Sequence, residues 1–204
     1  MTLNVSVTDE QLGHYYRRIS AIAGRLGKSL DFQKVMDSLQ EIHDNEFKTE
    51  NKFLARLYLD EEIWISETTG EKTIAQSSDV FKGWIDSDFI NWGTDKQGKS
   101  TERTKVEVYE MRRDATFEQM FTSLGDIDKL CFEQEQIINF CLEHPDKLRK
   151  DGYATFFLFK VHDRPFVAIV FLGSGGLEVR VYRFDYDYVW GAEIRPRVVV
   201  PQTL

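Results

Sequence analysis

The chain has 204 residues, of which 42% are hydrophobic and 13% aromatic, with a formal net charge of -8 and a pI near 5.1. A chain of this length and composition can bury its own core without disulfide or metal staples. The negative charge argues against general binding to nucleic acid or to anionic membranes, because such binding relies on Lys and Arg side chains.

Other features of the sequence bear on its location. Cys131 and Cys141 fall in one predicted helical region, so free, buried thiols are expected rather than a disulfide framework. The N-terminal residues MTLNVSVTDEQLGHYY contain no basic segment followed by an apolar one, so no secretion signal is expected. The longest apolar runs, such as FVAIVFL at 166–172, are too short to span a bilayer. These features predict a cytoplasmic protein without a membrane association.

The N-terminal segment predicts two helices. A capping box at Thr8 and Gln11 precedes apolar residues at helical spacing over 12–26, and a second helical pattern follows over 31–42. The short connection between the two patterns is typical of a helical hairpin.

The segment that follows predicts β-structure and then a short helix. EEIWISETTGEKTIAQ, at 61–76, is typical of a β-hairpin with Thr-Gly in its turn. DVFKGWIDSDFINWG, at 79–93, is rich in aromatic and turn residues and predicts a short helix within an irregular segment. Residues 1–93 are a candidate subdomain.

The middle of the chain alternates between loop, strand and helix signals. TDKQGKSTERTK, at 94–105, has no apolar residue and predicts an exposed loop. VEVYEM, at 106–111, alternates as a strand does. Two helices are expected next: DATFEQMFTSLG, from a cap at Asp114, and EQEQIINFCLEHP, stopped by Pro145.

The C-terminal part predicts a sheet. YATFFLFKV, FVAIVFL and LEVRVYRF are strand patterns separated by the turn sequences HDRP and GSGG, which indicates an antiparallel meander. The middle run is apolar throughout, as expected of a strand covered on both faces. We therefore expect an α+β fold, with a mainly antiparallel sheet, a C-terminal β-meander over part of 106–204 and about four helices, in one compact domain.

Residues 185–195 separate polar from apolar side chains by alternate positions. Asp185, Asp187 and Glu193 fall on one face, and tyrosines and Trp190 fall on the other. Such alternation predicts a half-buried antiparallel strand, with a bend at Gly191 because the run is long.

Two interpretations of the acidic residues remain open. Hard carboxylate oxygens suit Mg²⁺ or Mn²⁺, so Asp185, Asp187 and Glu193 are candidate catalytic residues of a metal-dependent hydrolase or nuclease. Cross-strand pairs with Arg180 and Arg183 account for the same charges without a site.

Other motifs are weaker, and the sequence assigns no cofactor and no metal site. The sequence Asp-Ser-Asp at 86–88 supplies only the first two ligands of a calcium loop. GSGG precedes a strand, whereas a phosphate-binding loop leads into a helix.

Because no catalytic constellation is found, the sequence favours a non-enzymatic binding or protein-interaction domain with an unidentified protein partner. Trp84, Phe89 and Trp92 are the candidate binding residues, as exposed aromatic side chains anchor many interfaces. A metal-dependent hydrolase is one alternative. An acidic inhibitor or decoy of a nucleic-acid-handling protein is the other, because an acidic surface competes with nucleic acid for a basic partner.

Several blocks together carry a resemblance: DATFEQMFTSLG, DKLCFEQEQIINFC, GYATFFLFKV, YDYVW and RVVVPQ. They resemble a family of uncharacterised proteins from uncultured, small-genome bacteria of the candidate phyla, over most of the chain from Gly24 onward. The resemblance implies a bacterial, cytoplasmic protein and carries over no functional residues.

Overall fold

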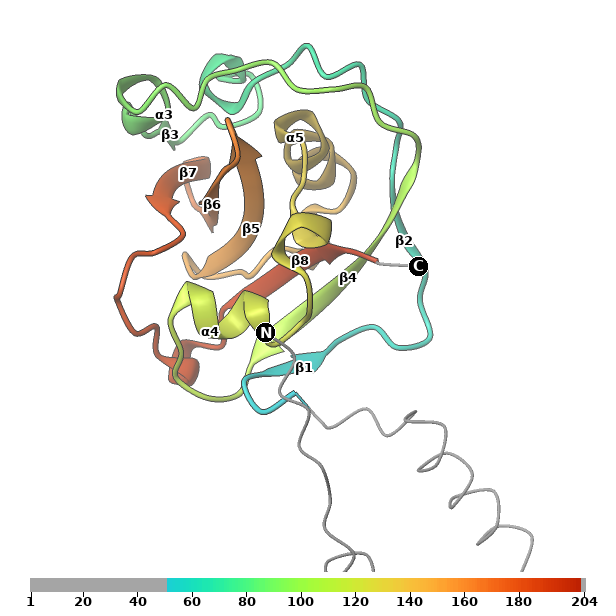
Figure 1. Ribbon diagram of the computed structural model, residues 1–204, viewed down its shortest axis with the longest axis vertical. Coiled ribbons are helices and arrows are strands. Elements are labelled where there is room, and N and C mark those ends of the chain that lie inside the picture. The colour runs from blue at the N-terminus through green and yellow to red at the C-terminus, as the bar shows by residue number, and fades with distance from the viewer. Residues whose placement is uncertain (1–50, 203–204) are drawn as a thin grey trace, which may run out of the picture. The chain divides into compact units, whose positions relative to one another are not determined.

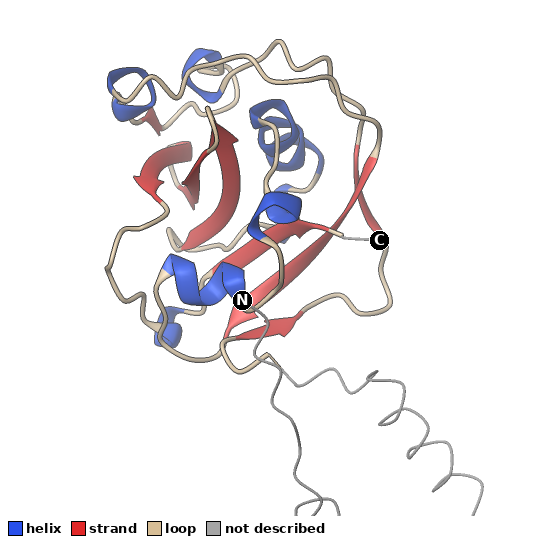
Figure 2. Ribbon diagram, in the orientation of Figure 1, coloured by secondary structure: helices blue, strands red, loops and turns tan. Residues whose placement is uncertain are grey.

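The computed structural model describes residues 51–202, which belong to one compact unit of the chain. The helical hairpin expected over 8–42 lies outside the described residues. The described part is a mixed α/β fold with a mainly antiparallel sheet of eight strands and three α-helices (Figures 1 and 2). None of the helices in 51–202 is long and apolar enough to cross a membrane.

The elements follow one another along the described chain with short 3₁₀ turns between them. The strands are β1 (Leu54–Arg56), β2 (Ile63–Ile65), β3 (Trp84–Ile85), β4 (Thr104–Met111), β5 (Ala154–Val161), β6 (Arg164–Gly173), β7 (Gly176–Arg183) and β8 (Arg197–Pro201). The α-helices are α3 (Asp88–Asn91), α4 (Phe117–Thr122) and α5 (Gln134–Glu143). The 3₁₀ turns are η1 (Ile74–Gln76), η2 (Ile127–Leu130), η3 (Pro145–Lys147) and η4 (Ala192–Ile194).

The strands lie in the order β1-β4-β8-β5-β6-β7-β3, with β2 also beside β4. The predicted meander is confirmed, because β5, β6 and β7 pair antiparallel in succession. Two pairs are parallel, β5 with β8 and β3 with β7. Since β8 lies on the far side of β5 from β7, the connection over 184–196 has to cross a face of the sheet.

Both faces of the sheet are covered, which explains the apolar run of β6. On one face, Phe157 and Phe159 of β5 pack with α5, and on the other Phe156 and Leu158 pack with α4. Figure 1 shows the sheet curving around α5, which also contacts β2. Each large apolar side chain buried in this way contributes about 1.5–3 kcal/mol to stability, so the two-sided core holds the central strands firmly.

The two predicted middle helices are present, but one begins later than expected. Thr116, and not Asp114, is the N-cap of α4, where its side chain accepts from the Gln119 backbone in a capping box. Asp114 accepts instead from the Ala192 backbone amide at 2.8 Å. Helix α5 ends just before Pro145, as predicted. With the short α3, the described residues contain three α-helices, fewer than the four expected for the whole chain.

The hairpin predicted over 61–76 is wrong. Strand β2 pairs with β4, where Ile63 faces Val106, and the other half of the expected hairpin forms η1. Alternation of side chains shows that a segment is extended but does not say which strand it pairs with. The 94–105 segment is largely exposed between its buried first residue, Thr94, and the start of β4. Strands from 51–93 pair with β4 and β7, so the residues on either side of this loop share one sheet.

The strand predicted over 185–195 is also wrong. The segment is the crossover between β7 and β8, and it holds one isolated bridge, Trp190 to Ala115, and the turn η4. Gly191 precedes that turn and is not a bend in a strand. Of the predicted inner face, Trp190 packs onto the core, with its ring 4.9 Å from Phe156 and 5.3 Å from Phe117, whereas Tyr186 and Tyr188 are 42% and 52% exposed.

Candidate binding pocket at the edge of strand β7

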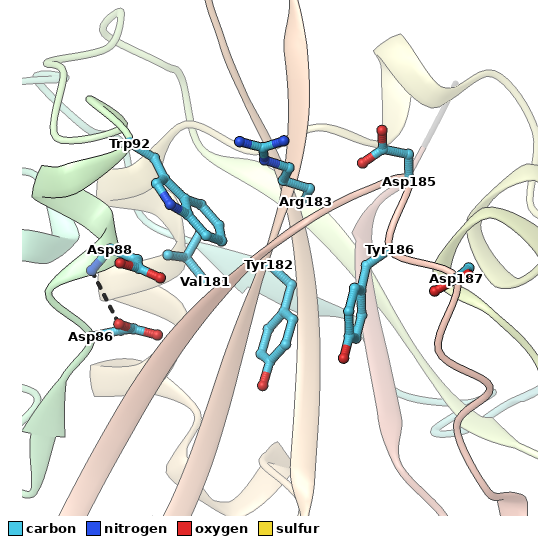
Figure 3. Close-up of a pocket in the computed structure, with 9 residues that line it drawn as sticks. All are labelled: Asp86, Asp88, Trp92, Val181, Tyr182, Arg183, Asp185, Tyr186 and Asp187. Atoms are coloured by element: carbon cyan, nitrogen blue, oxygen red, sulfur yellow. Dashed lines mark hydrogen bonds between the residues drawn. The ribbon is translucent and has the colours of Figure 1, made fainter.

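The edge of the sheet beyond β7 carries the short strand β3 and then helix α3. Strand β3 pairs parallel with β7 only at Glu178 and Val179. The chain then leaves the sheet at Asp86, whose side chain accepts from the Asp88 amide at 3.1 Å at the start of α3 (Figure 3). This turn places two carboxylates beside the strand edge.

Helix α3 is held in place by hydrogen bonds from the residues that follow its C-terminus. Thr94 donates to the Phe89 carbonyl from both its amide, at 2.8 Å, and its hydroxyl, at 2.9 Å. The Thr94 carbonyl in turn accepts from the side chain of buried Gln134 at 2.7 Å. The first residue of α5 therefore positions the wall of the pocket.

A pocket of about 480 Å³ lies along this edge. Figure 3 shows residues of the α3 segment on one side of β7 and residues of the crossover on the other. The lining residues are Asp86, Asp88, Trp92, Val181, Tyr182, Arg183, Asp185, Tyr186 and Asp187.

The pocket is strongly acidic, since four aspartates and one arginine line it. None of the four carboxylates forms an ion pair with another residue of 51–202. Asp86 accepts a hydrogen bond from the Asp88 amide, and Asp88 accepts one from the Asn91 side chain; these neutral donors orient the carboxylates without neutralising them. The pocket is thus a region of negative potential bounded by protein walls, which focus the field.

Aromatic rings form the second component. Tyr182 contacts Tyr186 at 5.2 Å between ring centroids, and Tyr186 stacks on Tyr188 at 6.0 Å. Tyr188 in turn meets the edge of Trp190 at 5.1 Å. Because Trp190 is anchored in the core, this chain of rings fixes the crossover beside the pocket. The faces of aromatic rings carry partial negative charge and attract cations.

The arginines contact rings rather than the neighbouring acids. The guanidinium of Arg183 lies 5.4 Å from the ring centroid of Trp92. Arg180 lies over Trp84 at 5.7 Å and over Phe171 at 5.0 Å. The cross-strand pairs with Asp185 and Asp187 considered from the sequence are not formed.

The aromatic residues singled out from the sequence have separate positions. Trp92 lines the pocket and is 38% exposed. Trp84 is 46% exposed but lies outside the pocket lining. Phe89 is fully buried and stacks on Phe159, so the expectation that it is a surface residue is wrong.

The three candidate catalytic acids are not brought together. Asp185 and Asp187 line the pocket, whereas Glu193 lies in η4 and does not. Across residues 51–202, no three His, Cys, Asp or Glu side chains are grouped so that they could hold a metal ion.

Sequence reasoning missed most of the pocket. The pair Asp86 and Asp88 was visible as a fragment of a calcium loop, but its position beside the crossover depends on β3 joining β7. Tyr182 was placed in a strand that does form, and Tyr186 was visible only as part of one face of a strand that does not. Their signal was the density of Tyr and Asp between 182 and 188.

No family model, curated protein or solved structure matches the chain. The resemblance noted from the sequence blocks therefore stays a prediction.

Proposed function

We propose that this protein is a non-enzymatic interaction protein whose pocket at the edge of β7 binds positively charged groups of a protein partner. One observation carries the proposal: four aspartates that form no ion pair within 51–202 and the rings of Trp92, Tyr182 and Tyr186 line the same cavity. Carboxylates attract ammonium and guanidinium groups, and ring faces add cation–π attraction of about 0.5–2 kcal/mol.

Arg183 supports this assignment and also limits the site. Its guanidinium already lies over Trp92, which shows that the ring accepts a cation in this position. The same charge repels an incoming cation. A partner therefore gains most from the carboxylates and from the tyrosine side of the pocket.

The proposal is tested with a seven-residue peptide of alternating Lys and Val, acetylated and amidated, titrated into the full chain. The indole N–H signal of Trp92 in the NMR spectrum, assigned with a Trp92→Phe variant, reports binding. A double variant, Asp88→Asn with Asp187→Asn, should bind about 5- to 30-fold more weakly, because each exposed ion pair contributes about 0.5–1 kcal/mol. Binding should also weaken as salt is raised, since salt screens such pairs.

The matched control removes the same charge elsewhere. Asp60 and Asp151 are exposed, and Asp151 precedes the start of β5, at the opposite end of the strands from the pocket. Asp60→Asn with Asp151→Asn should leave the affinity within about twofold of the wild-type value. Equal weakening by both double variants would show that the peptide responds to net charge alone and would refute the pocket as the binding site.

A further inference from the structure

Strand β7 has one edge that is only partly occupied. Along its other edge it pairs with β6 over its whole length, from Gly176 to Arg183. On the free side, β3 pairs with residues 178 and 179 and ends at Ile85. Within the described part of the chain, the edge from Arg180 to Arg183 has no neighbouring strand.

The main-chain groups of alternate residues on this edge point away from β6, at exposed Arg183 and at Val181, which is 2% exposed on the floor of the pocket. The Phe184 amide donates to the Pro165 carbonyl next to β6, whereas the Val179 carbonyl accepts from the Asp86 amide on the opposite side at 2.9 Å. In an antiparallel pair, successive residues alternate between hydrogen-bonded and non-hydrogen-bonded positions. The N–H groups of Val181 and Arg183 therefore point the same way as the groups of Val179, away from β6.

The pocket lies on this part of the edge. Its lining includes Val181, Tyr182 and Arg183 of β7, with the α3 segment on one side of the strand and the crossover on the other (Figure 3). An extended peptide placed in line with β3 would run along this edge, and its side chains would alternate between the two faces of the sheet. Cationic side chains on one face would then meet Asp86 and Asp88, and those on the other face would meet Asp185 and Asp187.

We infer that the partner presents an extended, basic segment that adds to the edge of β7 as a short strand over 180–183. The inference rests on the proposed function and names the form of its ligand. Strand addition draws affinity from main-chain hydrogen bonds and specificity from side chains. Here the main chain of β7 would supply the hydrogen bonds, and the aspartates and rings would select the side chains of the partner.

The test on the protein uses two substitutions at one exposed position. Arg183→Pro removes the outward N–H, and proline is accepted at edge positions whose N–H faces away from the sheet. Arg183→Ala removes the same side chain but keeps the N–H. The Lys-Val peptide should bind Arg183→Pro about fivefold or more weakly than Arg183→Ala, as one hydrogen bond contributes about 1 kcal/mol.

The test on the peptide needs no change in the protein, so it holds if Arg183→Pro does not fold. Two further Lys-Val peptides carry N-methyl groups on all lysine amides or on all valine amides. At least one should bind about tenfold more weakly than the parent, because a methyl group replaces the N–H that faces β7 and obstructs pairing.

The outcomes separate the two claims. If both N-methylated peptides bind the pocket as tightly as the parent, strand addition is overturned while the cation-binding pocket stands. Equal affinities of Arg183→Pro and Arg183→Ala overturn it in the same way. If the parent peptide produces no shift of the Trp92 signal up to millimolar concentration, the pocket itself is overturned and strand addition with it.

Discussion

Replacing Gln134 by Ala should destabilise the protein more than any other single polar substitution in the first turn of α5. The side chain is 4% exposed. Its oxygen accepts from the Ile74 amide at 3.0 Å, and its nitrogen donates to the carbonyls of Thr94, at 2.7 Å, and Lys96, at 3.0 Å. One side chain thus joins η1, the loop after α3 and the helix itself.

The magnitude follows from the groups left behind. Alanine leaves two buried main-chain groups, the Ile74 amide and the Thr94 carbonyl, without this hydrogen-bond partner. The partly buried Lys96 carbonyl loses its bond to the side chain as well. An unpaired buried main-chain group costs about 1–3 kcal/mol, so we expect a loss of about 3–5 kcal/mol in the free energy of unfolding. For a chain of this size, that lowers the melting temperature by roughly 6–20 °C.

Two measurements check this reasoning. Thermal unfolding gives the shift, and limited trypsin digestion under native conditions reports release of the loop through cleavage after Lys96 and Lys99. Gln97→Ala is the matched control, because Gln97 makes one exposed bond, to the Glu71 carbonyl, and should cost about 0.5 kcal/mol or less. A Gln134→Ala variant that melts within 2 °C of Gln97→Ala, with unchanged cleavage, would refute the reasoning.

Three further predictions concern local features. Asp163→Gly in the two-residue β5–β6 turn should raise the free energy of unfolding by about 0.5–1 kcal/mol, measured by urea denaturation, because its φ of 61° favours glycine. Gly70→Ala should cost about 2–4 kcal/mol, since a Cβ would lie 2.5 Å from the Lys99 main chain, whereas Gly93→Ala, with a similar φ but open space, should cost about 1 kcal/mol. Burial raises the pKa of Cys131 to about 11, so its alkylation at pH 8 should be about a hundredfold slower than that of a free thiol and should accelerate as the pH rises. Cys141, whose pKa burial also raises, should react only on unfolding, and mass spectrometry of alkylated peptides distinguishes the two thiols.

The elements that sequence predicted well are those whose patterns are local. Strands β5, β6 and β7 lie next to one another in sequence and in the sheet, so strand runs and turn residues were sufficient to define them. The burial of Cys141 was predicted for the same reason, because the neighbouring apolar residues on its helix share its face. The end of α5 before Pro145 needed only the rule that proline interrupts a helix.

The elements that sequence missed depend on distant partners. Ile63 alternates as a strand residue, but its partner Val106 lies far along the chain, and no local rule selects it over the nearer Ile74. The crossover over 185–195 alternates in sequence, but its bridge to the rest of the described chain is the isolated one between Trp190 and Ala115. Phe89 was expected at the surface as one of several aromatic residues in an irregular segment, yet it is the residue through which α3 packs on Phe159.

The edge of β7 combines charged side chains with exposed aromatic rings. An unpaired edge is a hazard, because it can pair with the edge of another copy, and charged residues such as Asp86 and Asp185 oppose that by placing like charges together. That protection needs charge alone and does not explain why Trp92 and Tyr186 remain 38% and 42% exposed beside it. Exposed aromatic surface gains free energy when a ligand covers it. The same acids that repel a second copy of this edge therefore favour a basic strand, and the rings beside them provide the apolar surface on which such a strand would pack.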